Sequence, residues 1–123
     1  MYRRIVVAVA KTETAERAVE VAIDLAERYG AELHLVTAVD KGAGPNSNAR
    51  HGAETYLESL APAGAQTHVV PGAPAEVILL VAEERNADLV VVGNVGMDRR
   101  ILGSVPNAVA HGAGCSVLIV DTA

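Results

Sequence analysis

The sequence predicts an α/β protein with a doubly wound, five-stranded parallel sheet and helices on both faces. Five short runs rich in Val, Ile and Leu alternate with segments whose apolar residues recur at helical spacing. Half of the residues are apolar but only three are aromatic, so aliphatic side chains must fill the core, as in parallel sheets covered by helices. Strands joined through helices require right-handed crossovers and hence a parallel sheet. The expected strands span residues 5–10, 33–39, 67–70, 89–92 and 117–120.

Four helices are expected to join these strands, each marked by residue types that begin or end a helix. Polar capping residues or proline stand at the starts, and residues that tolerate a left-handed backbone follow the ends. The expected boundary residues are Thr12 or Thr14 and Gly30 for the first helix, Asn46 and Ser47 for the start of the second, Pro74 and Asn86 for the third, and Ser104 and His111 for the fourth.

Composition narrows the class of protein further. A formal net charge of −5 disfavours nucleic acid or anionic lipid as a partner. Every apolar run is far shorter than the roughly 20 residues that a membrane helix needs, so no span is expected.

The single cysteine, Cys115, cannot form an intramolecular disulfide, and no charged-then-apolar leader precedes Arg4, so we expect a cytoplasmic location. The loop-like stretch 41–48 is too short for a linker, so residues 1–123 are expected to form one domain.

A glycine-rich loop after the fourth expected strand is the strongest candidate site. Gly93, Gly96 and Gly103 precede Ser104 at the mouth of a helix. Glycine lets backbone N–H groups approach an anion, and a helix N-terminus adds unpaired donors, so such a loop could hold phosphates. The alternative is that the glycines only turn the chain and Ser104 is an ordinary N-cap. No Gly-Lys-Ser/Thr occurs, and the first strand-to-helix turn lacks the glycines of a dinucleotide-binding fingerprint.

Three stretches resemble the universal stress protein (UspA-type) family: IVVAVAKTETAERAVEVA near the start, GAPAEVILLVAEERNADLVVVGN, and VVVGNVG followed by LGSVPNAVAHGAGCSVLIV. The similarity covers nearly the whole chain. It implies a Rossmann-like fold with strand order 3-2-1-4-5 and a homodimer formed through the last strand. In one branch of the family it also implies ATP or a related adenine nucleotide, bound at a Gly-x2-Gly-x9-Gly-Ser/Thr loop, with Mg²⁺ as a further expectation.

Carried over by this resemblance, the nucleotide-binding residues are Val39 in the adenine pocket and Gly93, Gly96, Gly103, Ser104 and Val105 around phosphate and ribose. Two departures weaken the expectation. Only six residues separate Gly96 from Gly103, and Ala10 stands where nucleotide-binding members commonly carry an acidic residue. Loss of a charged acceptor costs about 1.5 to 3 kcal/mol, or one to two decades of affinity, so weak binding is expected.

Charged residues near the loop have two interpretations. Lys11, Arg99 and Arg100 either pair with phosphate at the rim of the pocket or are solvated surface charges, and the second interpretation is favoured. Asp40, Asp98 and Asp121 could hold Mg²⁺ beside a nucleotide, although most are expected to be turn residues.

The remaining candidate residues indicate neither a metal site nor catalysis. Glycines between His111 and Cys115 break any helix that would bring the two together, so a structural role is expected for both. His34, His51 and His68 share no spacing and are expected on the surface of the sheet or helices. No group of residues would activate water or form a covalent intermediate, so an enzyme is not expected.

Two functions remain open from the sequence. The first is a stress-response module that binds an adenine nucleotide and acts as a regulator rather than a catalyst. The second is a dimeric scaffold of the same fold that does not bind nucleotide, as Ala10 and the shortened loop suggest. Hydrolysis of ATP is the least favoured third possibility.

Overall fold

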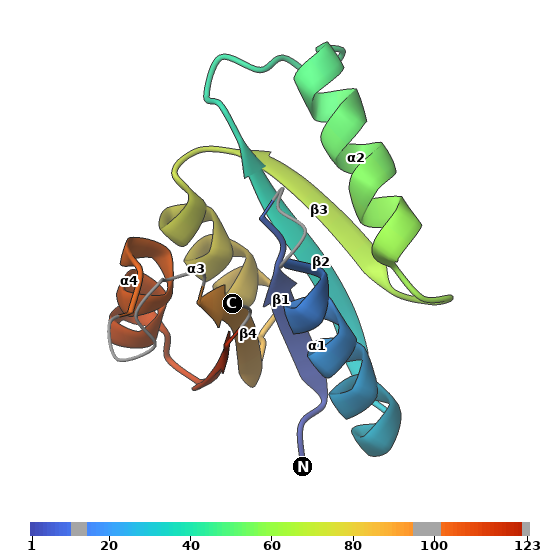
Figure 1. Ribbon diagram of the computed structural model, residues 1–123, viewed down its shortest axis with the longest axis vertical. Helices are drawn as coiled ribbons and strands as arrows, with labels where there is room; N and C mark the ends of the chain where they lie inside the picture. Colours follow the sequence, from blue (N-terminus) through green and yellow to red (C-terminus); the bar gives the residue numbers. More distant parts are fainter. Residues whose placement is uncertain (11–14, 95–101, 122–123) are drawn as a thin grey trace.

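The structure is a computed structural model that describes residues 1–10, 15–94 and 102–121 (Figure 1). Strands and helices alternate along the chain as predicted. The elements are β1 (Arg4–Ala8), α1 (Ala15–Tyr29), β2 (Glu32–Val39), α2 (Asn48–Leu60), β3 (Gln66–Pro71), α3 (Pro74–Glu84), β4 (Leu89–Asn94), α4 (Ser104–Gly112) and β5 (Ser116–Asp121). All strand pairs are parallel and the order is β3-β2-β1-β4-β5, so the predicted fold class and topology are confirmed.

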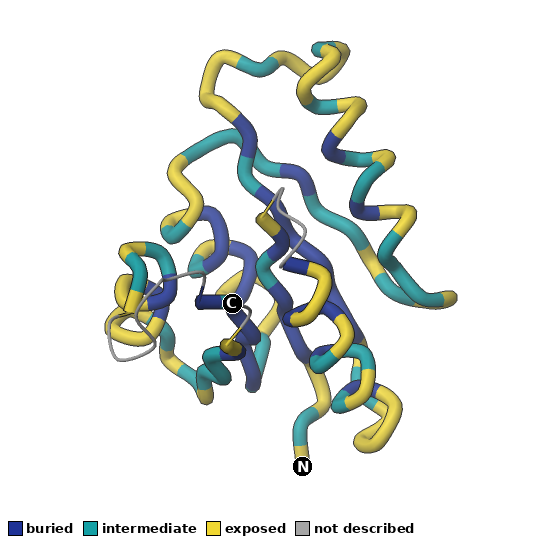
Figure 2. The backbone as a smooth tube through the Cα atoms, viewed as in Figure 1, coloured by how far each residue is buried: buried dark blue, intermediate teal, exposed yellow. Residues whose placement is uncertain are grey.

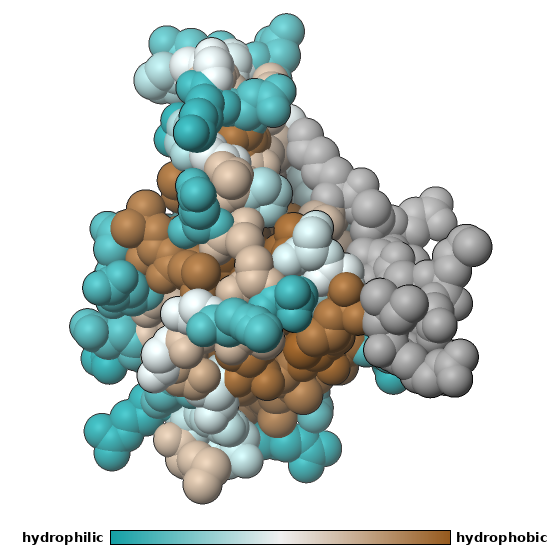
Figure 3. Space-filling model, turned by 90° about the vertical axis from the view of Figure 1, so that its left-hand side faces the viewer, coloured by the Kyte–Doolittle hydropathy of each residue, from teal (hydrophilic) through white to brown (hydrophobic). Residues whose placement is uncertain are grey.

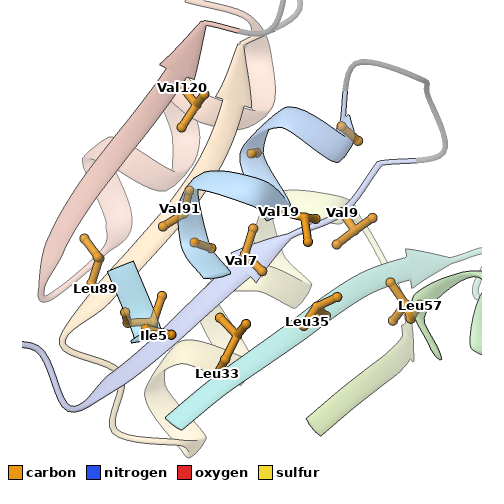
Figure 4. Close-up of a cluster of buried hydrophobic side chains, with 14 of the residues drawn as sticks. Ile5, Val7, Val9, Val19, Leu33, Leu35, Leu57, Leu89, Val91 and Val120 are labelled. Carbon is orange, nitrogen blue, oxygen red and sulfur yellow. The ribbon is translucent and has the colours of Figure 1, made fainter. Parts of the chain in front are cut away.

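The strand β1 lies at the centre of the sheet, and its alternate side chains enter two separate cores. Ile5 and Val7 pack beneath α1 and α2, together with Leu35 of β2 and Leu57 of α2 (Figure 4). Val6 faces the opposite side, where α3 and α4 cover the sheet. The buried backbone is therefore concentrated in the central strands (Figure 2). A strand buried on both faces explains the unbroken aliphatic run in the sequence.

The ends of the first three helices follow the predicted residue types, whereas α4 begins one residue earlier than predicted, because its N-cap is Gly103 and not Ser104. Gly30 after α1 has φ 63° and Asn86 after α3 has φ 53°, both in the left-handed region that ends helices. The hydroxyl of Ser47 accepts the backbone N–H of Arg50 at 3.2 Å and caps α2. Pro74 is the first residue of α3, where its missing N–H costs nothing. Thr12 and Thr14 lie outside the described residues.

One expectation about the histidines is wrong. His34 of β2 was expected at the surface, yet it is only 1% exposed and faces the core beneath α3. It is not isolated there, because its Nδ1 lies 2.9 Å from Nε2 of His68 on β3 and its Nε2 lies 3.3 Å from Glu32. A buried imidazole is tolerated when both ring nitrogens have partners, as they do here. His51 is exposed on α2, as expected.

The surface carries apolar areas on the side formed by α3 and α4 (Figure 3). Leu80 of α3 is 48% exposed, and Leu102, which precedes α4, is 39% exposed. Across the described ranges, every helix is too short or too polar to cross a membrane.

Candidate functional site

A cavity of about 500 Å³ opens at the carboxyl ends of the central strands. Its floor comes from the ends of β1, β2 and β4, and its walls come from the starts of α1, α3 and α4. In the order β3-β2-β1-β4-β5 the chain reverses direction across the sheet beside β1. Open parallel sheets bind their ligands at this point, because the helices on the two faces leave a crevice there. Its volume is in the range of small-molecule sites.

The wall of the cavity is almost entirely apolar. Alanine, valine, isoleucine and proline supply most of it, and among the described residues only Thr37 and Ser104 contribute polar side chains. No charged side chain of the described part lines the cavity. Such a wall suits a flat apolar group held by a few directed polar contacts.

Thr37 makes the side-chain hydrogen bond next to the last backbone hydrogen bond between the ends of β1 and β2. The N–H of Val9 donates to the carbonyl of Val36 at 2.8 Å, and the Thr37 hydroxyl donates to the carbonyl of Val9 at 2.7 Å. Thr37 is 7% exposed, so this hydroxyl is a buried polar group whose proton is committed within the protein. The contact fixes the chain between β1 and Ala10, which lies at the mouth of the cavity.

Asn94 holds the start of α4 against the end of β4. Its side-chain Oδ1 accepts the backbone N–H of Gly103 at 2.9 Å, and Asn94 itself is 6% exposed. Gly103 is the N-cap residue of α4 and its carbonyl accepts from Asn107. The N–H of Gly103 is therefore engaged within the protein rather than directed at a ligand.

Two backbone donors remain at the N-terminus of α4. Ser104 and Val105 occupy the first two helical positions, whose N–H groups have no partner inside a helix, and Pro106 in the third position has no N–H. No side chain caps this end within the described ranges. Both residues line the cavity, so their donors and the positive end of the helix dipole are available to an anion there.

The structure brings together part of the predicted site. Gly93, Gly103, Ser104 and Val105 line the cavity. Val39 does not, because it is 9% exposed and packs in the core beneath α1 and α2. Its neighbour Ala38 and Val36 supply the wall from β2 instead, since alternate residues of a strand face opposite sides. Gly96, Lys11, Arg99 and Arg100 lie outside the described residues.

The other candidate residues lie away from the cavity. His111 is exposed in the last turn of α4, and Cys115 packs against the core beneath α3 and α4. Burial, followed by the nearby Asp88 carboxylate, raises the pKa of the Cys115 thiol, which makes it a poor nucleophile. Asp40 and Asp121 are exposed and do not line the cavity, and Asp98 is outside the described part. Over the described ranges, no group of three or more His, Cys, Asp or Glu residues could hold a metal ion.

Sequence reasoning missed Thr37 and Asn94 as residues that shape the site. Thr37 is the single hydroxyl in the aliphatic run of residues 33–39, and Asn94 is the polar residue that directly ends the fourth strand. Both positions are at the carboxyl ends of strands, where ligand crevices form. A polar residue near the carboxyl end of an apolar run was therefore the available signal.

The fold and cavity define a doubly wound α/β protein with a ligand crevice at its topological switch point. The chain belongs to the universal stress protein family, whose model matches residues 1–121. A universal stress protein of Methanocaldococcus jannaschii is 29% identical over 98% of this chain and 82% of its own length.

Two solved structures of similar proteins contain a nucleotide. A universal stress protein in complex with cAMP is 34% identical, covers 99% of this chain and 98% of its own, and superimposes with a TM-score of 0.79. The universal stress protein of Archaeoglobus fulgidus in complex with dAMP is 25% identical over 96% of this chain and 97% of its own, with a TM-score of 0.67.

Proposed function

We propose that this protein is a stress-response module that binds an adenine nucleotide in the cavity and acts as a regulator rather than a catalyst. The observation that carries the proposal is the apolar cavity of about 500 Å³ into which the N-terminus of α4 opens. Complexes of similar proteins with cAMP and dAMP support adenine nucleotides as the ligand class. The same reasoning extends to ATP, which shares the base and the α-phosphate.

The cavity residues fit the two ends of such a ligand. The adenine base would pack against Val36 and Ala38 of β2, and a phosphate would accept from the N–H groups of Ser104 and Val105 and from the Ser104 hydroxyl. Gly93 and Gly103 would let the ligand approach the backbone closely. We propose that Gly96 contributes further donors and that Lys11, Arg99 and Arg100 are solvated charges near the rim.

The ribose and base are held without a carboxylate. Ala10 lies exposed at the mouth of the cavity and offers no acceptor. Affinity would therefore come mainly from the phosphates, and binding would be weak. A Mg²⁺ ion that accompanied ATP would be held by phosphate oxygens and water, as is usual for this ion.

The regulatory role rests on the chemistry of the wall. A catalyst of hydrolysis needs a base or an activated nucleophile beside the reacting phosphate. Among the described residues that line the cavity there is no carboxylate, histidine or cysteine. Occupancy of the cavity would instead change the surface at its mouth, beside the starts of α1, α3 and α4, and a partner could recognise that change.

Isothermal titration calorimetry tests the proposal on five proteins. The native chain should bind ATP more tightly than adenosine, and Ala10→Asp should strengthen binding by restoring an acceptor. Gly103→Val should abolish ATP binding. The Cβ alone would meet only ordinary contacts at Gly103, 3.5 Å from Asn94 Oδ1 and 3.7 Å from Pro106, so Gly103→Ala should fold as the native chain does and serves as the smaller companion variant. Gly44→Ala, in open space away from the cavity, is the matched control.

The alternative function is a dimeric scaffold that binds no nucleotide, which the missing acceptor at Ala10 favours. Absence of heat with ATP for both the native chain and Ala10→Asp would establish this alternative and exclude the first.

We also propose that the protein is a homodimer formed through β5. Among the described residues, β4 is the one strand that pairs with β5, so the outer edge of β5 carries N–H and C=O groups that a second copy would satisfy. Light scattering at micromolar concentration should give the mass of two chains, and Ile119→Asp, at a half-buried position of β5, should shift the mass toward one chain. A native protein with the mass of one chain would exclude the dimer.

We further propose a cytoplasmic location, consistent with a free Cys115 thiol.

A further inference from the structure

We propose that Arg50 and Pro71 close the outer edge of β3 against pairing with a second copy of this chain. Among the described residues, β2 is the one strand that pairs with β3, so β3 is an edge strand of the sheet. An exposed edge can add a further strand, and natural proteins commonly block such edges. The sequence of β3, QTHVVP, contains no Lys, Arg, Asp or Glu that would repel a second copy. Closure of this edge therefore has to come from other groups.

The backbone of Val69 in β3 points away from β2. The N–H of Gly72 donates to the carbonyl of Val39 at 2.9 Å, so the backbone groups of Gly72 face β2. Along a strand, alternate residues direct their N–H and C=O groups to opposite edges. The even-numbered residues of β3 therefore bond to β2, and the outer edge consists of the backbone groups of Thr67, Val69 and Pro71.

A side chain from α2 occupies the carbonyl oxygen of Val69. Arg50 donates to it through Nη2 at 3.2 Å, and α2 runs alongside β3 (Figure 1). Two contacts hold Arg50 in this position: its backbone N–H donates to the Ser47 hydroxyl at the N-cap, and its Nε lies 3.9 Å from a carboxylate oxygen of Glu54. A charged donor makes a stronger hydrogen bond than a neutral amide. An incoming strand would have to displace the guanidinium to reach this oxygen.

Pro71 removes a donor from the same edge, because proline has no N–H. In a two-fold antiparallel pair centred on Val69, the two copies of Val69 would exchange hydrogen bonds, and Thr67 would exchange them with Pro71 of the second copy. Arg50 occupies the acceptor of the first exchange, and Pro71 lacks the donor of the second. The bond from the Thr67 N–H to the Pro71 carbonyl is all that remains, which is too little to hold two strands together.

The other edge of the sheet differs from β3. The sequence of β5, SVLIVD, contains neither proline nor a basic residue. With β3 closed, pairing between sheets continues only through β5, and a two-fold pair of β5 strands ends at two chains. Open edges on both sides would instead permit a fibre. This consequence rests on the proposed homodimer, whereas the closure of β3 does not.

The test opens the edge with the double variant Arg50→Met and Pro71→Val. Methionine keeps an apolar stem without a donor, and valine restores an N–H at position 71. Light scattering from micromolar to millimolar concentration should give a constant mass for the native chain and, for the double variant, a mass that rises to at least twice the native value. Hydrogen exchange at the N–H groups of Thr67 and Val69, followed by NMR, should slow as the mass rises.

Single variants provide the controls. Arg17→Met removes the same charge at an exposed position of α1 and should keep the native mass. Arg50→Met alone leaves Pro71 in place, so it should give a smaller rise in the same direction. This variant tests the inference even if the double variant fails to fold.

The outcomes separate this inference from the proposed homodimer. Native mass for both Arg50→Met and the double variant over the whole range would overturn the inference. So would a higher mass with unchanged hydrogen exchange at Thr67 and Val69, because the copies would then associate through another surface. A native protein with the mass of one chain would overturn the β5 homodimer instead, and the ratio of variant to native mass would still test the closure of β3.

Discussion

The rings of His34 and His68 share a hydrogen bond of 2.9 Å across the β2–β3 pair, and their planes are nearly parallel, 26° apart with centroids 5.1 Å from each other. Glu32 lies 3.3 Å from the other nitrogen of His34 and 3.6 Å from Arg4. Because a carboxylate accepts, Nε2 of His34 carries the proton and its Nδ1 accepts from His68. The arrangement holds one added proton but not two, since two would place N–H against N–H.

Replacing His68 should reduce the loss of stability in mild acid. Burial, then the charge of Arg85 and the neighbouring His34, lower the pKa of His68 below its ordinary value of 6.5. The unfolded chain therefore binds more protons in that range, so the stability is full above about pH 6.5 and falls as the pH drops toward the lowered pKa. His68→Gln keeps an N–H donor but does not titrate. Urea unfolding at pH 7.5 and 5.5 should show a smaller difference for His68→Gln than for the native chain.

His51→Gln is the control for this prediction, because His51 is exposed on α2. It should leave the pH dependence as in the native chain. If His68→Gln and the native chain lost the same free energy of unfolding between pH 7.5 and 5.5, the loss of stability in acid could not be assigned to His68.

Asp88→Asn should destabilise the fold by about 1 to 2 kcal/mol at neutral pH, an amount limited by the partial exposure of the carboxylate. The side chain accepts the backbone N–H groups of Arg3 at 2.9 Å and Arg4 at 3.1 Å, which ties the chain before β1 to the start of β4. Desolvation raises the pKa of Asp88, but these hydrogen bonds outweigh it, and the net pKa lies below its ordinary 3.8.

Because the pKa of Asp88 is lowered, its contribution is present above pH 3.8 and is lost as the pH falls through the folded value. Denaturant unfolding should therefore give a lower free energy of unfolding for Asp88→Asn than for the native chain at neutral pH, and the two values should become equal in strong acid. Asp24→Asn, which removes an exposed pair with Arg28, should change stability little. A difference in the free energy of unfolding that stays constant with pH would refute the role of the Asp88 charge.

Gly52→Ala should stabilise the protein. Gly52 lies in the middle of α2, is exposed, and has open space where a Cβ would be placed. Alanine is favoured over glycine there by up to about 1 kcal/mol, equivalent to a rise in Tm of about 3 to 6 °C. Gly30→Ala has equally open space but φ 63°, so it should cost about 1 to 2 kcal/mol. Thermal melts in which both variants shift in the same direction would contradict this reasoning.

Asn94→Asp should weaken ATP binding about tenfold at low salt. The carboxylate still accepts the N–H of Gly103, but it adds a negative charge beside the proposed phosphate site. Adenosine, which has no phosphate, should bind the variant and the native chain alike. Calorimetry with both ligands at low and high salt checks this, because screening should shrink the effect on ATP. An equal loss for adenosine would indicate damage to the cavity instead.

The sequence was sufficient for the strands and helices because their signals are local. The aliphatic run around Val6 and the left-handed residues Gly30 and Asn86 mark elements and ends without reference to the rest of the chain. The burial of His34 could not be predicted this way, because it depends on His68, 34 residues away, and the two meet only through the pairing of β2 with β3.

Only the part of the candidate site that has a local signal in the sequence was predicted. Ser104 and Val105 follow directly from the glycine loop and the helix that begins there. The wall on β2 depends on which alternate side chains of the strand face the cavity, and a shift of one residue exchanges Val39 for Ala38. The roles of Thr37 and Asn94 require the contacts to Val9 and Gly103, which no spacing in the sequence reveals.

The hydrogen bond between Asn94 and Gly103 joins two residues nine positions apart and fixes both ends of the stretch between them. The entry of the chain into α4 is thereby set by β4. One buried amide thus acts as a clamp between the two elements that border the cavity on this side, and Ser104 and Val105 owe their place at the cavity to it.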